Sequence, residues 1–305
     1  MIIAVASGKG GTGKTTVATS LALSTATTGA QNETDKSVNS ADPLFLDCDV
    51  EEPNAALFLK PTLEHRDEVG ILIPQVDAAK CTRSACGRCA EVCVWHAIAV
   101  VGEKVLVFPE LCHGCGSCTL NCPEGAISEV LHVMGSLESG PAGPLYFGQG
   151  TLDVGQAMGV PIIRQLKAKH LAGADGRVII LDAQPGTACP VVETMRDADF
   201  VLLVTEPTPF GLHDLRLTVE VARNELGLPV GVVVNRDGLG DAGVDEYCAQ
   251  EGIPILMRIP LDRRIAEGIS EGQALVDVLP EYRIRFRALY QEIQRQVEPR
   301  ATVEA

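Results

Sequence analysis

The sequence predicts an α/β fold in which a mostly parallel sheet carries helices on both faces, together with a small inserted α+β domain. Three observations support this prediction. A short apolar run leads into a glycine-rich loop at the N-terminus, apolar segments alternate with helical ones in the second half, and eight of the eleven cysteines lie in between. Continuous apolar strands are typical of a sheet that is covered on both faces. A chain of 305 residues is long enough for one such domain and a small second one.

The strands expected for this sheet are short apolar segments that end in turn formers or lead into helical patterns. The first, 2–6, leads through the glycine-rich loop into a helix at 15–23, and the second, 44–46, ends at Asp47-Cys48-Asp49. Later strands are expected at 178–181, 200–205, 230–234 and 255–259. The polar stretch 24–42 is rich in turn formers, and we expect it to be a mobile surface excursion.

The cysteine-rich block is an insertion, because the two halves of the α/β domain flank it. We expect the first part of the α/β domain at 1–76, the insert at 77–131 and the second part at 132–305. A stretch rich in glycine and proline, 135–150, is expected to connect the insert to the second part.

The net charge of −15 argues against a nucleic-acid partner, because nucleic-acid binding needs a basic surface. The N-terminus, MIIAVASGKGG, is apolar but has neither a basic region nor a cleavage site, so we expect a buried strand and not a signal peptide. No stretch approaches the roughly 18 apolar residues of a membrane span. The cysteine spacings are those of metal ligands, which fits a reducing compartment, and we expect a cytoplasmic protein.

The second cysteine run has the spacing C-x2-C-x2-C-x3-C followed by proline, and its members are Cys112, Cys115, Cys118 and Cys122. This spacing is typical of iron–sulfur ligands, with three thiolates around one cluster and the fourth bound to a neighbouring cluster. The first run repeats the scheme with two extra residues after its first member and Val94 in place of the proline; its members are Cys81, Cys86, Cys89 and Cys93. The runs therefore predict two clusters. A pair of structural zinc sites is the alternative, although zinc ribbons favour well-separated C-x2-C pairs.

The two runs end in similar phrases, Cys93-Val94-Trp95-His96-Ala97-Ile98 and Cys122-Pro123-Glu124-Gly125-Ala126-Ile127, which indicates a duplicated unit. This block resembles the two-cluster bacterial-type ferredoxins, which implies a ferredoxin α+β fold for the insert. The resemblance implies that one [4Fe–4S] cluster is bound by Cys81, Cys86, Cys89 and Cys122. It implies that the other is bound by Cys93, Cys112, Cys115 and Cys118.

The glycine-rich loop reads Gly8-Lys9-Gly10-Gly11-Thr12-Gly13-Lys14-Thr15 and is followed by Thr16. Glycines allow a close backbone turn, so that successive N–H groups surround phosphate oxygens at the start of a helix. The pattern is a P-loop, in which Lys14 is expected to reach the β and γ phosphates and the Thr15 hydroxyl to bind Mg²⁺. We therefore expect ATP or ADP, with Mg²⁺, at residues 8–16.

Lys9 gives this loop a second lysine. The phrase Lys-Gly-Gly-Thr-Gly-Lys-Thr resembles the deviant Walker A motif of the MinD, ParA and Mrp ATPases and of the nitrogenase iron protein. In those proteins the earlier lysine crosses a dimer interface to reach the partner's nucleotide. The resemblance implies the same role for Lys9, the P-loop NTPase fold of the deviant Walker A class, and an ATP-dependent homodimer or a heterodimer with a paralogue.

Two aspartate phrases resemble the switches of this family. Asp47-Cys48-Asp49-Val50-Glu51-Glu52-Pro53-Asn54 resembles the first switch, which implies that Asp49 orients or activates the attacking water. Ile180-Leu181-Asp182-Ala183-Gln184-Pro185-Gly186-Thr187 resembles the second, which implies that Asp182 lies by Mg²⁺ and that the Gly186 amide senses the γ-phosphate. Asn235 and Pro260, at the ends of two later strands, resemble positions that contact the adenine.

Three cysteines lie outside the two runs. Cys48 is expected to be a small core residue. Cys189 lies seven residues after Asp182, like a cluster ligand of the nitrogenase iron protein, but the stretch 135–150 lacks the second cysteine that a shared cluster needs, so we expect a buried thiol. Cys248 is a lone thiol on an expected helix, whereas Mrp-type cluster carriers have a C-x-x-C pair in this half.

The C-terminal helix expected at 282–297 has an apolar stripe formed by Ile284, Leu289, Ile293 and Val297. Such a stripe fits either packing on the sheet or a membrane surface, as in MinD itself. We favour packing on the sheet, and we expect no membrane binding.

The leading hypothesis is an Mg²⁺-dependent, dimeric ATPase that is coupled to electron transfer through two [4Fe–4S] clusters. One alternative is an ATP-gated factor for the assembly or insertion of an iron–sulfur or metal cofactor. Another is a positioning protein of the MinD type that senses redox state. The first two imply a redox partner or a cofactor client that the sequence does not identify.

Overall fold

The computed structural model describes residues 1–26, 42–174 and 176–301, so most of the predicted excursion at 24–42 lies outside the described residues. The chain divides into two compact units. The first comprises residues 1–66, 137–151 and 163 onward, and the second comprises residues 67–136 and 152–162. The second unit contains the expected insert, 77–131.

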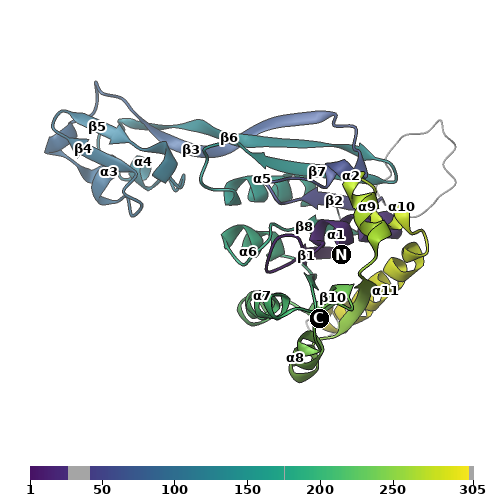
Figure 1. The fold of residues 1–305 in the computed structure, drawn as a ribbon. Coiled ribbons are helices and arrows are strands. Elements are labelled where there is room, and N and C mark those ends of the chain that lie inside the picture. Colours follow the sequence, from purple (N-terminus) through teal and green to yellow (C-terminus); the bar gives the residue numbers. More distant parts are fainter. Residues whose placement is uncertain (27–41, 175, 302–305) are drawn as a thin grey trace. The chain divides into compact units, whose positions relative to one another are not determined.

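A mostly parallel sheet of nine strands has the order β11-β10-β9-β1-β8-β2-β7-β6-β3 (Figure 1). In chain order the strands are β1 (Ile2–Ala6), β2 (Leu44–Asp47), β3 (His65–Val76), β6 (Ile127–Ala142), β7 (Leu145–Leu152), β8 (Ile179–Asp182), β9 (Phe200–Thr205), β10 (Val230–Asp237) and β11 (Ile255–Pro260). Every pairing from β11 across to β7 is parallel. The predicted α/β class is therefore confirmed.

The register of the central strands brings three functional segments to one edge of the sheet. Asp182 at the end of β8 pairs with Val5 of β1 on one side and with Asp47 of β2 on the other. Because the carboxyl ends of parallel strands meet at one edge, the loops after these strands share a site there.

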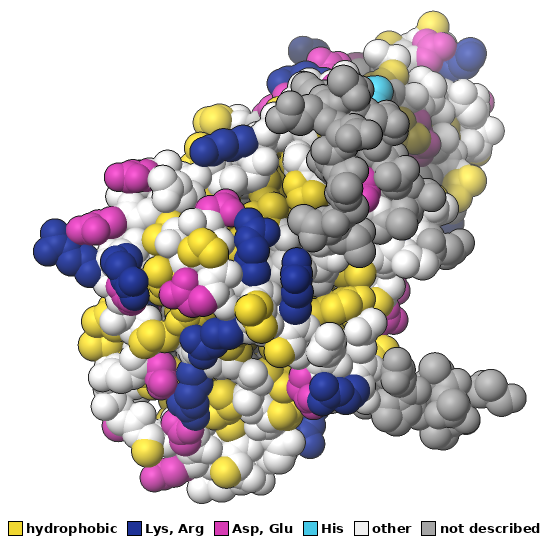
Figure 2. All heavy atoms as spheres, turned by 90° about the vertical axis from the view of Figure 1, so that its right-hand side faces the viewer, with side chains coloured by type: hydrophobic (Ala, Val, Ile, Leu, Met, Phe, Trp, Pro, Cys, Tyr) yellow, Lys and Arg dark blue, Asp and Glu magenta, His cyan; other side chains and the backbone are white. Residues whose placement is uncertain are grey.

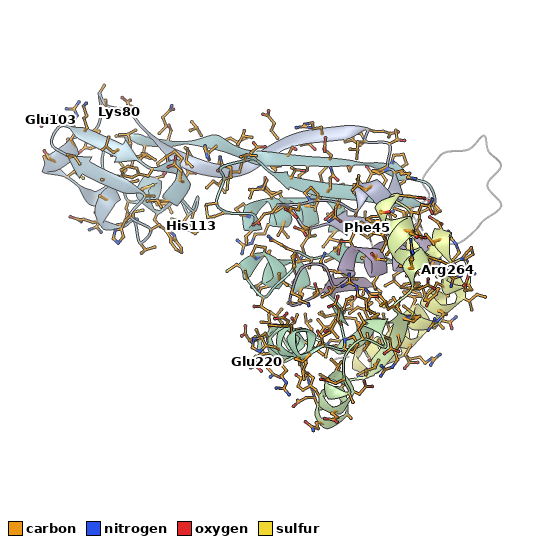
Figure 3. All side chains as sticks on the ribbon, viewed as in Figure 1. Phe45, Lys80, Glu103, His113, Glu220 and Arg264 are labelled. Atoms are coloured by element: carbon orange, nitrogen blue, oxygen red, sulfur yellow. The ribbon has the colours of Figure 1, made fainter. Side chains whose placement is uncertain are left out.

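Helices cover both faces of the sheet in the first unit. They are α1 (Lys14–Thr25), α2 (Ala56–Leu59), α5 (Val160–Leu171), α6 (Cys189–Met195), α7 (Pro209–Val219), α8 (Gly243–Glu251), α9 (Arg263–Ser270), α10 (Leu275–Val278) and α11 (Tyr282–Ala301). Figure 1 shows α5, α6 and α7 on one side of the sheet and α1, α10 and α11 on the other. Phe45, labelled in Figure 3, is fully buried on the α1 side and stacks on Phe147 with ring centroids 6.0 Å apart.

Residues 135–150, which were expected to connect the insert to the second part, pass from the second unit to the first as regular strands. They belong to β6 and β7, which are neighbours in the sheet and are joined by a short turn at Gly143. The glycines that suggested a connector serve close packing: a Cβ at Gly140 would collide with the Thr62 carbonyl, and one at Gly148 would press on Leu46.

The second unit contains an internal repeat. It holds an antiparallel hairpin of β4 (Ile98–Val101) and β5 (Lys104–Val107), with the short helices α3 (Arg88–Glu91) and α4 (Ser117–Leu120). His96 and Gly125 occupy matching places in the two phrases and have nearly equal φ angles, +53° and +55°. This left-handed conformation suits glycine, so the repeat keeps its backbone even where histidine replaces it.

The C-terminal helix packs on the sheet. Leu289 and Ile293 of α11 are buried in the same core as α1, whereas Ile284, which we had placed on the apolar stripe, is 73 % exposed. Figure 2 shows acidic and basic side chains mixed over the face that these C-terminal helices form. None of the helices in the described part of the chain is long and apolar enough to cross a membrane.

Candidate nucleotide site and cysteine cavities

The glycine-rich loop between β1 and α1 forms one wall of an open cavity of about 420 Å³. The cavity is lined by Ser7, residues 9–16, Asp49, Glu52, Asn54, Leu57, Phe58, Pro185, Arg236 and Ile269. The loop turns into α1 at Gly13, where φ is +90° and a Cβ would collide with the amide of Asn235. Only glycine fits this place, and the turn leaves the first amides of α1 available to an anion.

Lys14 and Asp182 form a buried ion pair beside this cavity. Lys14 Nζ donates to Asp182 Oδ1 at 2.7 Å, and the two side chains are 7 % and 0 % exposed. Burial alone would lower the pKa of Lys14, but the charge and the hydrogen bond of Asp182, together with the charges of Asp47 and Asp49, outweigh it, so that the pKa is raised. Lys14 is therefore charged where a phosphate would meet it.

The same carboxylate fits a magnesium ion. Asp182 Oδ2 is buried and has no hydrogen-bond partner among the described residues. An ionised carboxylate oxygen in that state accepts a cation or the water bound to one. Thr15, whose hydroxyl is the expected Mg²⁺ ligand, lines the same cavity, so the residues present fit Mg²⁺ bound together with a nucleotide.

Asp47, which the sequence analysis did not select, holds the first switch loop in place. Its Oδ1 accepts the Asp49 N–H at 3.1 Å, and its Oδ2 accepts the N–H groups of Asn54 and Ala55, both at 3.0 Å. Burial, together with the nearby charge of Asp182, raises the pKa of Asp47. An aspartate at the end of an apolar strand is the sequence signal that could have indicated this residue. The hydrogen bonds that its carboxylate accepts from backbone N–H groups compensate for its burial.

Asp49 lies in the wall of the cavity, as a residue that orients water would. Burial raises the pKa of Asp49 to about 6, with Lys14 opposing this effect and Asp182 adding to it. A carboxylate whose pKa lies near neutral is suited to accept a proton from water.

Lys9, the lysine that precedes Lys14 in the loop, forms an ion pair within its own chain. Lys9 Nζ lies 3.2 Å from Glu206 Oε2 and is 34 % exposed. The other oxygen of Glu206 accepts from Arg236, which also lines the cavity. The sequence assigned no role to Glu206 or Arg236; the position of Arg236 directly after Asn235 is the signal that could have indicated one.

Of three further expected site residues, two form hydrogen bonds with the loop region and one lies outside the cavity. Asn235 donates from its amide to the Thr12 carbonyl at 2.7 Å and so supports the P-loop. The Gly186 N–H donates to the Ser7 carbonyl at 2.8 Å, which links the second switch to the P-loop. Pro260 is the exposed last residue of β11 and is not among the residues that line the cavity.

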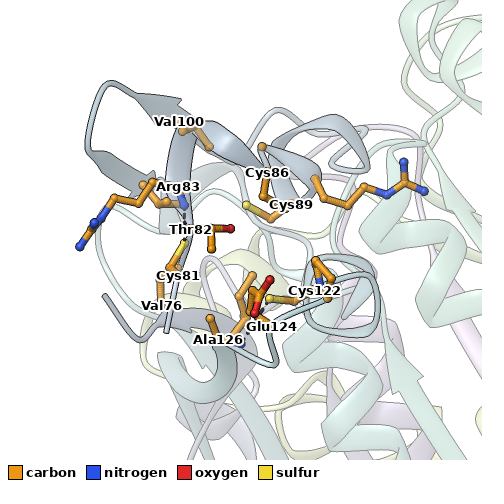
Figure 4. Close-up of a pocket in the computed structure, with 15 residues that line it drawn as sticks. Val76, Cys81, Thr82, Arg83, Cys86, Cys89, Val100, Cys122, Glu124 and Ala126 are labelled. Atoms are coloured by element: carbon orange, nitrogen blue, oxygen red, sulfur yellow. Dashed lines mark hydrogen bonds between the residues drawn. The ribbon is translucent and has the colours of Figure 1, made fainter. Parts of the chain in front are cut away.

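The eight cysteines of the two runs line two separate cavities, four in each. Figure 4 shows the first cavity, with three cysteines from the first run and the last one from the second: Cys81, Cys86, Cys89 and Cys122. The second cavity has the reverse composition: Cys93, Cys112, Cys115 and Cys118. The structure thus brings together the two sets that the ferredoxin resemblance implied.

Backbone amides point at sulfur atoms in both cavities. Ala97 N–H donates to Cys93 Sγ at 3.2 Å, and the matching Ala126 N–H donates to Cys122 Sγ at 3.3 Å. Such donors stabilise thiolate sulfur in iron–sulfur sites. In the described part of the chain, no three Cys, His, Asp or Glu side chains are grouped closely enough to hold a single ion. Four thiols line each cavity, and four thiolates are the donor set of a [4Fe–4S] cluster, so the residues present fit such a group.

The cysteines outside the runs behave differently from one another. Cys48 and Cys248 are buried, as Cys48 was expected to be. Cys189 is exposed at the first position of α6, so the prediction of a buried thiol was wrong. The reason is that α6 begins directly after the second switch, at the surface edge of the sheet where the loops gather.

The sheet order and the P-loop after its first strand define the fold of the MinD-type P-loop ATPases, combined in this chain with a 4Fe-4S binding segment. Residues 105–128 match the family model of the 4Fe-4S binding domain. The septum site-determining protein MinD of Pyrococcus horikoshii, solved with Mg-ADP, is similar over 96 % of this chain and 95 % of its own, with a TM-score of 0.51 and 22 % identity.

Relatives in sequence include proteins of Methanocaldococcus jannaschii. An uncharacterized protein of that organism is 29 % identical over 277 residues, which are 90 % of this chain and 91 % of that protein. An iron-sulfur cluster carrier protein is 24 % identical over 136 residues, which are 39 % of this chain and 47 % of the carrier.

Proposed function

We propose that this protein is an Mg²⁺-dependent ATPase that dimerises with ATP and couples its nucleotide cycle to electron transfer through two [4Fe–4S] clusters. The observation that carries the proposal is the sharing of cysteines between the two cavities. Each cavity takes three thiols from one run and one from the other. Because each run serves both sites, neither cluster can leave without disturbing the ligands of the other, and this favours clusters that stay bound.

In the proposed ATPase, the residues that line or adjoin the cavity have separate roles. Lys14 and the amides of residues 10–16 bind the phosphates, and Thr15 with Asp182 holds Mg²⁺. Asp49 orients the attacking water, and Gly186 responds to the γ-phosphate. Positioning and neutralisation of charge are most of what phosphoryl transfer requires. Lys9 would break its ion pair with Glu206 to reach the partner's nucleotide. The half-buried position of this ion pair is compatible with that movement.

In the proposed function, the second unit binds the two clusters. When bound, two [4Fe–4S] clusters supply one-electron carriers whose potentials depend on hydrogen bonds to sulfur and on solvent exposure. This chain's own contribution is to hold the thiolates and to direct amides at them. Burial raises the pKa of the Cys112 and Cys118 thiols, so cluster binding must displace protons from these groups.

Cofactor delivery is the second candidate, and one observation favours it. A relative that matches 39 % of this chain is an iron-sulfur cluster carrier protein. In that case ATP would gate the release of a cluster to a client protein. A transferable cluster should be held by few, accessible thiols, whereas all but one of the eight thiols are partly or fully buried.

The two candidate functions predict different effects of ATP on whether the iron stays bound to the chain. Anaerobically purified protein should contain about eight iron and eight sulfide per chain. After many turnovers with ATP and an apo-ferredoxin as acceptor, electron transfer predicts that this iron stays with the chain. Transfer of iron to the acceptor only when ATP is present would establish delivery instead. Stoichiometric zinc without iron–sulfur absorbance, even after anaerobic reconstitution, would contradict both.

A further inference from the structure

A buried lysine of α5 caps the helix that follows the second switch. Lys167 is 5 % exposed, and its ammonium donates to the carbonyl oxygens of Glu193 at 2.8 Å and Arg196 at 2.5 Å. These carbonyls lie at the C-terminal end of α6, where a helix leaves acceptors unpaired. Asp197 Oδ2 lies 3.6 Å from the same nitrogen. The ammonium therefore donates to two carbonyl oxygens of this one helix end and forms an ion pair with the aspartate beside them.

Arg164, one turn earlier in α5, makes a second link to α6. Its guanidinium donates to Glu193 Oε2 at 3.0 Å, and the Glu193 side chain is largely buried. A buried charge that loses its partner is costly, so a movement of α6 away from α5 is strongly opposed. The two helices, which lie side by side in Figure 1, are thus held as one body.

The other end of α6 belongs to the nucleotide site. Its first residue, Cys189, comes three positions after Gly186, whose N–H is bonded to the P-loop at Ser7. Lys167 also lies near the first switch. Burial and Asp47 raise the pKa of the Cys48 thiol, and the charge of Lys167 opposes them. Lys167 therefore holds the end of the helix that follows the second switch, and it is not among the residues that line the cavity.

The chain runs from the second unit directly into α5. The second unit is called the cluster-binding unit because the proposed function places both clusters in it. Residues 152–162 belong to that unit, and they include the first turn of α5, whereas the helix from Ile163 onward belongs to the ATPase unit. A displacement of α5 is therefore also a displacement of the segment by which the chain leaves the cluster-binding unit.

We propose that Lys167 is a positioning residue that couples the second switch to the cluster-binding unit, by holding α6 on α5 so that switch movement is passed to residues 152–162. This inference rests on the proposed function, because it supposes that nucleotide and clusters influence each other. It names the mechanical link, which the proposed function leaves open.

The test compares wild type, Lys167→Met and Lys169→Met, each with both clusters assembled. Methionine keeps the length and packing of the side chain but cannot cap α6, and Lys169 is an exposed lysine two residues further along the same helix. Two quantities are measured with and without a non-hydrolysable ATP analogue: amide hydrogen exchange of 152–162 and the cluster midpoint potentials. We expect Lys167→Met to bind the analogue within about threefold of wild type but to lose more than half of both responses. Lys169→Met should respond like wild type.

A milder variant guards against misfolding. Arg164→Gln removes only the second link, from a side chain that is 64 % exposed, and should weaken both responses without affecting folding. Full responses in Lys167→Met, or in Arg164→Gln if Lys167→Met does not fold, would overturn the inference while leaving the proposed function intact. Absence of both responses in wild type would overturn the proposed coupling itself, and the inference with it.

Discussion

Lys14 Nζ and Asp182 Oδ1 lie 2.7 Å apart in a pair that is almost completely shielded from solvent. The lysine begins α1 and the aspartate ends β8, so the pair joins the P-loop to the second switch. In the proposed site a nucleotide phosphate would share Lys14 with Asp182, and Mg²⁺ would share Asp182 with Lys14. This competition would make the second switch responsive to what occupies the P-loop.

Substitution of Lys14 should affect both binding and stability. Lys14→Ala removes the charge that faces the β and γ phosphates and leaves Asp182 buried without its partner. We expect nucleotide binding to be lost and the free energy of unfolding to fall by about 3–5 kcal/mol. A fluorescent ATP analogue and urea denaturation measure the two effects. Lys9→Ala is the control, because its more exposed ion pair should contribute about 1 kcal/mol or less. Equal losses of stability in both variants would contradict the burial argument.

Asp49 should separate hydrolysis from binding. Asp49→Ala removes a group that orients water but none that contacts the phosphates of a bound nucleotide. We expect binding to remain within a few-fold of wild type and kcat to fall by about 100-fold or more. Asp47→Ala is an informative comparison, since it frees three backbone amides of the same loop and should weaken binding as well. If Asp49→Ala and Lys14→Ala lose binding equally, the assignment of the first switch is wrong.

The raised pKa of Asp49 predicts how stability depends on pH without nucleotide or Mg²⁺. Its folded pKa of about 6 exceeds the unfolded value near 3.9, so the folded state binds a proton more tightly. This contribution to stability is fully present below pH 4 and is lost as the pH rises through 6. Asp49→Asn lacks the titration, so its unfolding free energy should rise relative to wild type between pH 4 and pH 7. Urea midpoints that differ by a constant amount across this range would refute the prediction.

The nucleotide site was largely predictable because its chemistry is local in sequence. The P-loop and both switch phrases are contiguous, and a strand end brings each one to the same edge of the sheet. The contacts that were missed connect residues far apart in the chain, such as Lys9 with Glu206 and Lys167 with α6. Nothing local to a lysine indicates which distant acceptor it will meet.

The composition of 135–150 does not reveal the strands that this segment forms, because glycine there serves packing. Glycines and prolines suggested a connector, but Gly140 and Gly148 allow neighbouring strands and side chains to approach closely. The exposure of Cys189 and Ile284 was also not predicted, because it depends on how α6 and α11 are rotated against the sheet. The apolar pattern of a helix fixes its buried face only approximately, so it does not specify the exposure of a residue at the edge of that face.

Shared ligation of the two cysteine cavities predicts a crossed loss of iron. Cys122 belongs to the second run but lines the first cavity, and Cys93 has the reverse arrangement. Cys122→Ser should therefore disturb the same cluster as Cys86→Ser, and Cys93→Ser the same cluster as Cys115→Ser. Each variant should lower the iron content from about eight towards about four per chain. Electron paramagnetic resonance of the remaining cluster identifies which one is lost. If Cys122→Ser instead gave the same residual spectrum as Cys115→Ser, each run would bind its own cluster.

The central claim is that nucleotide state and cluster redox state are coupled through an ATP-dependent dimer. If cluster oxidation changes ATP affinity, ATP must change the midpoint potentials by the same free energy. The most direct measurement is a redox titration of both clusters with and without a non-hydrolysable ATP analogue, in wild type and in Lys9→Ala. We predict that the analogue shifts the potentials of wild type, and that Lys9→Ala binds the analogue and keeps both clusters but loses dimerisation and most of the shift. Identical potentials in wild type under both conditions, with the analogue shown to be bound, would contradict the account.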